Sequence, residues 1–362
     1  MGRSYAGVTV KDYHVVEHGD IVYTKSPLKK NPFGIIKENK GKRGIVSTLY
    51  AVYRPFPECF PTYLDHFFSV DYHLNSYLQP IVRKGAKNDM KVNNADVLKG
   101  DICVPGLPEQ QKIADCLDSA DTLIEAQGRK VEALKAHKKG LMQQLFPQEG
   151  ETQPRLRFPE FEGTGEWEEG TISDIGTVLQ GYGFPERYQG QQSGDFPFYK
   201  VSDISRSLGA GKTFIEKAAN YVNENQLKEL RAKPIPAGTT VFAKIGEAIR
   251  SNKRAITTVP CLIDNNAAGV KSIRGKATDF FIYLTMEQIS LIDHAGGVVP
   301  AVNKSAIEAI TVKFPKVAEQ QRIADCLTSL DDLIASETRK LDTLKTHRKG
   351  LMQQLFPQVG EE

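Results

Sequence analysis

The stretch Glu109-Gln-Gln-Lys-Ile-Ala-Asp-Cys-Leu117 recurs almost unchanged as Glu319-Gln-Gln-Arg-Ile-Ala-Asp-Cys-Leu327. Lys139-Gly-Leu-Met-Gln-Gln-Leu-Phe-Pro-Gln148 recurs in the same way as Lys349-Gly-Leu-Met-Gln-Gln-Leu-Phe-Pro-Gln358. Both recurrences have an offset of 210 residues, and 27 of the 40 positions from 109 to 148 are identical in the second copy. The residues ahead of each copy share far less. The chain therefore consists of a variable module and a shared segment, repeated once, and such a layout suits a bipartite target.

Apolar residues in the shared segment recur at alternating spacings of four and three. This period of 3.5 residues is typical of a coiled coil. The predicted seam of the first copy includes Ile124, Val131, Leu134 and Lys138, and that of the second includes Ile334, Glu337, Leu341, Leu344 and Arg348. Each helix should run about 37 residues and end before Pro147 or Pro357, because proline clashes with a continuing helix.

The polar seam residues indicate how the two helices pair. A parallel pairing would place Lys138 against Arg348 and Gln127 against Glu337, which brings two like charges together. An antiparallel pairing centred near residue 132 instead places Lys138 against Glu337 and Gln127 against Arg348. In that pairing Ile124, Val131 and Leu134 meet Leu351, Leu344 and Leu341. Charge therefore favours the antiparallel pairing. It would place the two modules at opposite ends of a rod with approximate twofold symmetry. The alternative is that each helix packs only on its own module.

The composition is that of an ordinary soluble globular protein. The 362 residues carry a net charge of only +3, so a nucleic-acid partner would have to be found in local charge. The five cysteines form no Cys-x-x-Cys pair, which is typical of reduced thiols in a cytosol. No apolar run approaches the ~20 residues that span a bilayer, and the amino terminus has no signal-peptide core. We expect a cytoplasmic protein without a membrane partner.

Each variable module is predicted to be α+β with an antiparallel or mixed sheet. The segments Met90 to Pro105 and Pro300 to Pro315 align at the offset of 210, and both should end in a short strand before the proline. Gly19 and Gly238 each precede an aromatic-bearing strand, as turn glycines do. One helix is predicted from Phe280 to Ile292.

Basic residues follow the aromatic-bearing strand in both modules, where they suit contacts with phosphate and base edges. The candidate DNA-binding residues of the first module are Lys25, Lys29, Lys30, Lys42 and Arg43. Those of the second module are Lys244, Arg250, Lys253 and Arg254, together with Gln180, Tyr182, Arg187 and Lys200 from two aromatic loops. The alternative is that these basic runs are solvated surface loops that bind no ligand, as most such runs are.

The sequence offers little support for catalysis by this chain. His14-Val-Val-Glu-His18 matches the H-x-x-E-H zinc pattern, which requires a helix, whereas Val15, Val16 and Gly19 favour a strand and turn. There is no G-x-x-x-x-G-K-[ST] loop and no G-x-G-x-x-G loop. We predict no catalytic residue and no metal site, although scattered acids could still form a nuclease site.

The E-Q-x-x-I-A-x-x-L helix start after a proline-ended strand resembles the specificity (S) subunit of Type I restriction-modification systems. Pro154-Arg-Leu-Arg-Phe-Pro-Glu-Phe161 and Trp167 are similar to that family's entry into a target recognition domain. The resemblance implies two α/β recognition domains joined by two long helices in an antiparallel coiled coil. Each domain would read one half of a split site in double-stranded DNA, and the helices would set the spacing and dock two methylation subunits, to which restriction subunits are added. S-adenosylmethionine, ATP and Mg²⁺ would belong to those partners, and this chain would bind no cofactor.

The resemblance predicts five segments. They are a first recognition domain at 1–107, a spacer helix at 108–148, a linker at 149–165, a second recognition domain at 166–317 and a second spacer helix at 318–358. From Trp167 to Gly238 the second module has 71 residues of lead-in, whereas 18 residues precede Gly19, so we expect a truncated first domain. The alternatives are an S-like chain that acts through one domain or by self-pairing, and an endonuclease with its own site.

Overall fold

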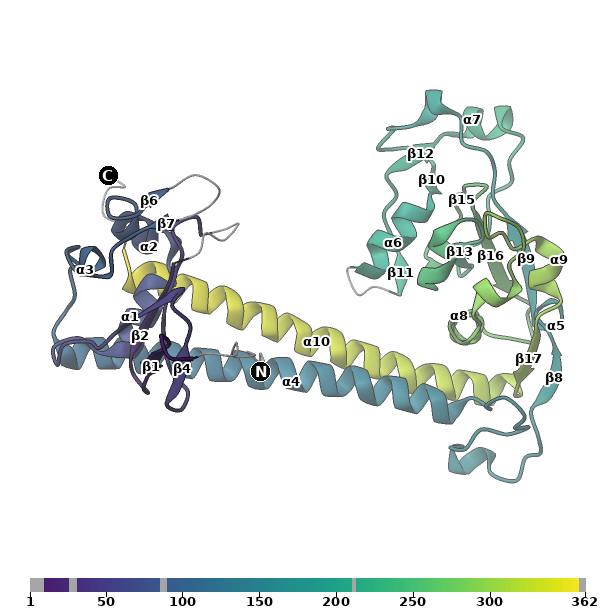
Figure 1. Cartoon of the computed structure of the whole chain (residues 1–362). Coiled ribbons are helices and arrows are strands. Elements are labelled where there is room, and N and C mark those ends of the chain that lie inside the picture. The colour runs from purple at the N-terminus through teal and green to yellow at the C-terminus, as the bar shows by residue number, and fades with distance from the viewer. Residues whose placement is uncertain (1–9, 26–30, 85–89, 210–212, 358–362) are drawn as a thin grey trace. The chain divides into compact units, whose positions relative to one another are not determined.

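The computed structural model describes residues 10–25, 31–84, 90–209 and 213–357, which form two compact units. Unit 1 combines Met1–Val131 with Glu337–Glu362, and unit 2 is Glu132–Ser336. Each unit therefore holds one variable module, part of the first long helix and part of the second (Figure 1). No helix of the described residues is long and apolar enough to cross a membrane.

The two long helices have the predicted extent. Helix α4 is Leu107–Leu145 and helix α10 is Val317–Leu355, and each ends at the residue before a phenylalanine and a proline. The predicted seam positions are buried or half-buried, whereas most positions between them are exposed. Within each unit the helices lie side by side, in opposite directions (Figure 1). The antiparallel pairing is confirmed.

The predicted register of that pairing is wrong by about one heptad. Lys138 Nζ donates to Asp331 at 2.6 Å rather than meeting Glu337, and in unit 1 Arg348 Nη2 donates to Asp121 at 2.9 Å rather than meeting Gln127. Glu337 accepts instead from Gln127 Nε2 at 2.7 Å. Long charged side chains reach residues that flank the seam, so matching seam residues only to each other gave the wrong register.

The contacts of the helix pair repeat with the sequence. Lys138–Asp331 and Arg348–Asp121 are the same ion pair at the offset of 210, formed once in each unit. Gln127 and Glu337 are each other's repeat equivalents. Hydrogen bonds from Gln127 and from Lys340 and Lys130 lower the pKa of Glu337 to about 2.

The module of unit 1 is built on a three-stranded antiparallel sheet of order β3-β2-β5. Its elements are β1 (His14–Val16), β2 (Ile21–Thr24), β3 (Ile35–Glu38), β4 (Gly44–Val46), β5 (Tyr50–Tyr53), α1 (Pro61–Phe68), α2 (Asp71–Leu78), β6 (Arg83–Lys84), β7 (Met90–Lys91) and α3 (Asn94–Val97). The β1 strand pairs with β4, so the H-x-x-E-H residues form the predicted strand and turn. Gly19 has a φ of +84°, which suits the predicted turn glycine.

The module of unit 2 is built on a five-stranded mixed sheet of order β11-β14-β13-β16-β9 and a three-stranded sheet of order β12-β10-β15. Its strands are β8 (Glu168–Thr171), β9 (Gly176–Gln180), β10 (Phe196–Tyr199), β11 (Phe214–Ile215), β12 (Asn220–Val222), β13 (Thr240–Ala243), β14 (Arg254–Thr257), β15 (Leu262–Ile263), β16 (Ala267–Ser272) and β17 (Thr311–Phe314). Its helices are η2 (Pro159–Phe161), α5 (Ile172–Ile175), η3 (Glu186–Tyr188), α6 (Val201–Gly209), α7 (Glu224–Glu229), η4 (Glu247–Ser251), α8 (Asp279–Gln288), η5 (Leu291–His294) and α9 (Lys304–Glu308). The helix predicted from Phe280 is α8, which ends earlier because the chain is extended at Ile289.

The strand predicted before Pro315 is confirmed as β17, but the strand predicted before Pro105 is wrong. The β17 strand exists because β8 pairs with it along four residues. In the described part of unit 1 no strand pairs with residues 101–104, which have no regular structure. A strand requires a partner, and the sequence of the segment alone did not show that this one has none.

Each module is fixed to its long helix by a fully buried glutamine of the Glu-Gln-Gln motif. Gln110 accepts from the backbone N–H of Phe60 and donates to the carbonyls of Glu58 and Pro105. Gln320 makes the same three bonds in unit 2, to Thr278 N–H, Lys276 C=O and Pro315 C=O. These contacts make α1 the equivalent of α8.

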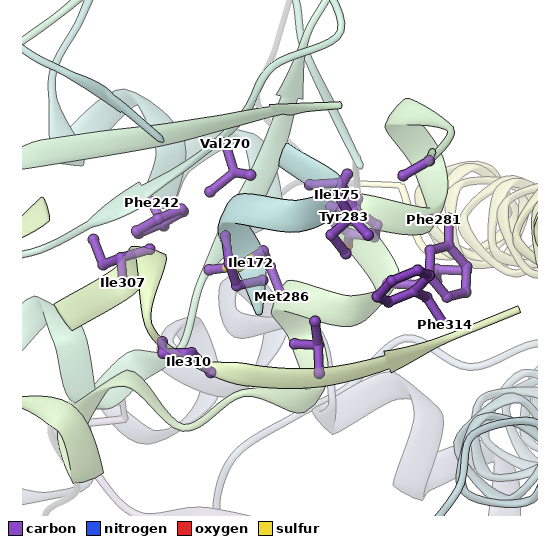
Figure 2. Close-up of a cluster of buried hydrophobic side chains, with 14 of the residues drawn as sticks. Ile172, Ile175, Phe242, Val270, Phe281, Tyr283, Met286, Ile307, Ile310 and Phe314 are labelled. Atoms are coloured by element: carbon purple, nitrogen blue, oxygen red, sulfur yellow. The ribbon is translucent and has the colours of Figure 1, made fainter. Parts of the chain in front are cut away.

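The main apolar core of unit 2 lies between the sheet, α8 and the adjoining ends of α4 and α10. Figure 2 shows Ile172 and Ile175 of α5 among Phe242, Val270 and Met286. Leu145 of α4 and Leu327 of α10 belong to the same core. In unit 1 Leu117 of α4 and Met352 of α10 complete the core in the same way.

Candidate nucleic-acid interface

Several polar side chains lie at one end of the five-stranded sheet. The register pairs Gln180, at the end of β9, with Ala268 of β16, and Ala268 with Phe242 of β13. Phe242 in turn pairs with Arg254 of β14. The residues that continue from these strand ends are Lys244, Lys253 and the turn Asn265–Asn266. The fold thus brings three predicted residues, Gln180, Lys244 and Lys253, to one edge.

The exposed turn Asn265–Asn266 was not among the DNA-binding residues predicted from the sequence. It connects β15 to β16, and the Asn266 carbonyl accepts from Lys244 N–H at 2.8 Å. The buried Asp264 carboxylate accepts from Asn266 N–H at 2.9 Å and so holds the turn closed. Asparagine side chains can contact adenine edges bidentately. The Asp-Asn-Asn run after an apolar strand was the available signal.

The same turn exists in unit 1 with different residues. Lys25 is the equivalent of Lys244, and its N–H donates to Leu49 C=O at 3.0 Å. The exposed turn there is Thr48–Leu49 between β4 and β5. The two modules thus present one backbone platform with different side chains at its tip.

A hollow of about 670 Å³ lies beside Lys244 in unit 2. Its lining includes Gly296 and Ala301, the two ends of the segment Gly296–Ala301, which exchange backbone hydrogen bonds. The tip of that segment exposes Val298 fully and Val299 to 61%. Exposed valines can contact thymine methyl groups, and the neighbouring lysine can contact phosphate. Val298 and Val299 were not among the residues predicted from the sequence.

Tyr182 and Lys200 lie beside the same turn but are already engaged. Tyr182 forms an isolated bridge with Asp264, and its hydroxyl accepts from Lys233 N–H at 3.0 Å. Lys200 donates to Gln189 Oε1 at 2.8 Å and lies 5.3 Å from the centre of the Phe184 ring. Burial raises the pKa of the Asp264 carboxyl. The side chains of both predicted residues thus have partners within their own module.

Arg187 and Arg250 are exposed but paired with carboxylates of their own module. Arg187 is bonded to Glu229, which also accepts from the Tyr188 hydroxyl. Arg250 donates to Glu247 at 3.0 Å, within the same short helix. Such surface pairs are weak and can be exchanged for phosphate contacts.

The prediction that Arg254 contacts DNA conflicts with its position in the structure. Its side chain is 1% exposed, and its guanidinium donates to Asn252 Oδ1 at 2.6 Å and lies over the Phe242 ring. Burial lowers its pKa to about 10. By strand register its equivalent in unit 1 is the buried Ile36, so Arg254 occupies a core position. A run of basic residues in the sequence did not reveal that one of them points inward.

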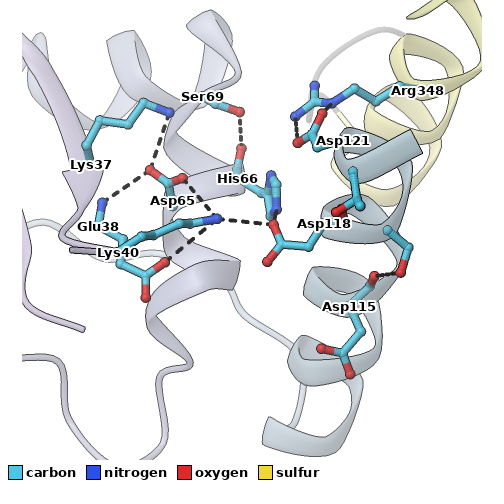
Figure 3. A network of polar contacts seen from close by, with 12 residues as sticks. Lys37, Glu38, Lys40, Asp65, His66, Ser69, Asp115, Asp118, Asp121 and Arg348 are labelled. Carbon is cyan, nitrogen blue, oxygen red and sulfur yellow. Dashed lines mark hydrogen bonds and ion pairs between the residues drawn. The ribbon is translucent and has the colours of Figure 1, made fainter. Parts of the chain in front are cut away.

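The basic run of unit 1 is partly neutralised by its own module. Figure 3 shows Lys37 and Lys40 directed at Asp65 of α1, with Lys40 also bonded to Asp118 of α4. These lysines join the sheet to the helices. Of the predicted DNA-binding residues, Lys42 is exposed, Arg43 is 3.8 Å from Glu17, and Lys25 donates to Asn94. Lys29 and Lys30 lie outside the described residues.

One group of side chains in the described residues has ligand atoms close enough for a metal ion, namely His66, Asp118 and Asp121. All three already have partners. His66 Nε2 lies 3.0 Å from Asp118, and Arg348 binds Asp121 (Figure 3). The group fastens α1 to the helix pair, and we assign it no metal.

A family model described as the Type I restriction modification DNA specificity domain matches residues 164–346. The chain is 26% identical over 286 residues to a putative type I restriction enzyme MjaX specificity subunit of Methanocaldococcus jannaschii, covering 76% of this chain and 63% of that protein. It thus spans less than two thirds of this relative. The MjaVIII specificity subunit of the same organism is 23% identical, with 61% of its length covered.

Solved structures share the fold. The S subunit of a Type I restriction-modification system from M. genitalium superposes with a TM-score of 0.59 at 13% identity, over 99% of this chain and 88% of that one. The HsdS subunit from Thermoanaerobacter tengcongensis gives a TM-score of 0.50 at 15% identity, over 95% and 82% of the two chains. These similarities confirm the predicted α+β architecture with two long helices.

Proposed function

Because the chain belongs to the Type I restriction-modification DNA specificity family, we propose that it is the subunit that reads the DNA sequence for such a complex. The observation that carries this proposal is the repeated platform, with Asn265–Asn266 at its tip in unit 2 and Thr48–Leu49 in unit 1. Amide, hydroxyl and methyl groups at an exposed tip are the chemistry of base-edge reading. Lys244 and Lys25, at matching positions, supply the positive charge that phosphate contact requires.

Different tips on a common backbone support reading of two different half-sites. The helix pair gives each module the same attachment, through Gln110 and Gln320. Direct contacts at base edges contribute about 1–3 kcal/mol each to discrimination, whereas phosphate contacts position the protein without regard to sequence. The tip turns would therefore set the sequence that is read, and the lysines would set overall affinity.

Catalysis would belong to other subunits. We propose that methylation subunits, two in number, dock on this chain and that restriction subunits join them, as the family's role implies. S-adenosylmethionine, ATP and Mg²⁺ would be bound by those partners in the cytoplasm. The family description itself names DNA specificity and no catalytic activity.

Selection of DNA by the purified chain tests the proposal. A pool of random duplexes should yield one bipartite motif, and cells that carry the chain with its methylation partner should show methylation at the same motif. Replacement of Asn265 and Asn266 by alanine should relax one half-site only. The matched double variant Thr48→Ala and Leu49→Ala should relax the other half only. A pool that yields no motif, or variants that relax both halves equally, would refute the assignment.

A further inference from the structure

The second module is completed by a lead-in segment, residues 157–180, whose contacts can be compared with the same positions in unit 1. Its apolar side chains Trp167, Ile172, Ile175 and Val178 all belong to the core of unit 2. Its strands extend the module, since β9 pairs with β16 and β8 pairs with β17. Arg157 and Trp167 bind the buried Glu319 at the start of α10.

Unit 1 has an open apolar cavity of about 210 Å³ at the matching place. Its lining includes Tyr23, Tyr53, Leu64, Val97 and Ile102. Strand register and the sequence repeat give the equivalents of these residues in unit 2, which are, in the same order, Phe242, Val270, Ile282, Ile307 and Val312. All five equivalents belong to the core that receives Ile172 and Ile175 in unit 2 (Figure 2). Apolar cavities of about 150 Å³ already hold benzene, so this one can accept a branched aliphatic side chain.

Two further positions of unit 1 match the contacts of the lead-in segment. The β5 strand has β2 on one edge, and no strand of the described residues pairs with its other edge. In unit 2 the equivalent strand is β16, and β9 pairs with the corresponding edge. Glu109 is exposed and no described side chain is bonded to its carboxylate, whereas its equivalent Glu319 is 3% exposed and accepts from Arg157 and Trp167. An open core, an open strand edge and an exposed carboxylate thus coincide.

We propose that this face of unit 1 is a docking site for a peptide segment with the pattern Arg-x9-Trp-x4-Ile-x2-Ile-x2-Val. The isoleucines of the segment enter the cavity, its last strand pairs with β5, and its arginine and tryptophan bind Glu109. A second copy of this chain is the less suitable source. Its own Ile172 and Ile175 are fully buried in its unit 2, which would have to open to release them.

A labelled synthetic peptide with the sequence of residues 155–181 provides the probe. Titration with the full chain, followed by fluorescence anisotropy, should show saturable binding of one peptide per chain. A peptide that carries Ile172→Asp and Ile175→Asp should bind about a hundredfold more weakly, because each buried side chain contributes roughly a factor of ten.

Variants of the chain locate the site. Leu98 lines the cavity and is 65% exposed, so Leu98→Asp should preserve folding and weaken binding by about tenfold. Leu123→Asp, at an exposed position of α4 away from the cavity, is the matched control and should bind normally. Glu109→Gln should weaken binding, whereas Glu125→Gln on the same helix should not.

A fusion of the segment to the chain distinguishes weak binding of the segment from no binding. The same residues joined ahead of Met1 by a Gly-Ser linker should slow hydrogen exchange in Tyr50–Tyr53, relative to a fusion that carries both aspartates. Equal exchange in the two fusions would overturn the proposal, as would peptide binding that Leu98→Asp leaves intact. A dimer of the unmodified chain that Leu98→Asp dissociates would show that the body of a second copy covers this face and would overturn the assignment to a peptide segment.

Discussion

Replacement of Glu319 by glutamine should destabilise unit 2 strongly. The carboxylate is 3% exposed and accepts from Arg157 at 2.8 Å and 2.7 Å and from Trp167 Nε1 at 3.2 Å. Glutamine keeps one oxygen but places an NH₂ group against a guanidinium donor. Breaking a buried pair by removing one partner costs about 3–5 kcal/mol. Arg157 retains Gly165 C=O and Thr164 Oγ1, so we expect about 2–4 kcal/mol.

The repeat supplies the control for this prediction. Glu109→Gln changes the same residue of the same motif at an exposed position, and it should alter stability by no more than about 0.5 kcal/mol. Denaturant-dependent hydrogen exchange measures the two units separately, with β17 reporting on unit 2 and β2 on unit 1. Equal effects of the two substitutions, or a loss below about 1 kcal/mol in unit 2, would refute the view that Glu319 holds the lead-in segment.

Five further substitutions test the helix pair and the candidate nucleic-acid interface. Lys138→Glu and Asp331→Lys should each cost about 1 kcal/mol and together recover most of the loss, whereas additive losses in urea unfolding would refute the observed register. Lys244→Gln and Lys253→Gln should each reduce the log-log salt dependence of DNA binding by about 0.9, and an unchanged slope would show that they do not contact phosphate. Arg254→Ile introduces the residue that unit 1 has at the equivalent position, Ile36, and should keep β14 folded. It should speed hydrogen exchange at 247–252, because Asn252 loses the hydrogen bond that Arg254 donates to it. Unaltered exchange would contradict the view that Arg254 holds this segment.

The sequence was sufficient to predict the long helices and their antiparallel direction, because a 3.5-residue period extends over the whole shared segment. It was not sufficient for the register. The charged residues Lys138 and Arg348 find partners beside the seam, and the module cores fix the helices through Leu117 and Leu327. Contacts of that kind join residues far apart in the chain, and no local pattern records them.

The candidate interface was predicted in part for a similar reason. Lys244 and Lys253 were found because basic residues follow a recognisable strand, but Arg254, one residue later, points into the core. The turn Asn265–Asn266 lies beyond the basic run and reaches the same sheet end only through strand pairing. Local charge indicated this end of the sheet, and the burial of Arg254 at the start of β14 decided that its side chain cannot reach a ligand.

The buried glutamine at the start of each long helix has a consequence for how such a protein can change. All three partners of Gln110, and all three of Gln320, are backbone atoms, so the joint does not depend on which side chains the module carries. A foreign module with the same chain path could be grafted at either position without redesign of the joint. Substitutions can accumulate freely at the tip turns for the same reason, since selection for assembly acts on main-chain geometry at the joint. New binding preferences can thus arise by exchange of whole modules while the machinery they attach to stays the same.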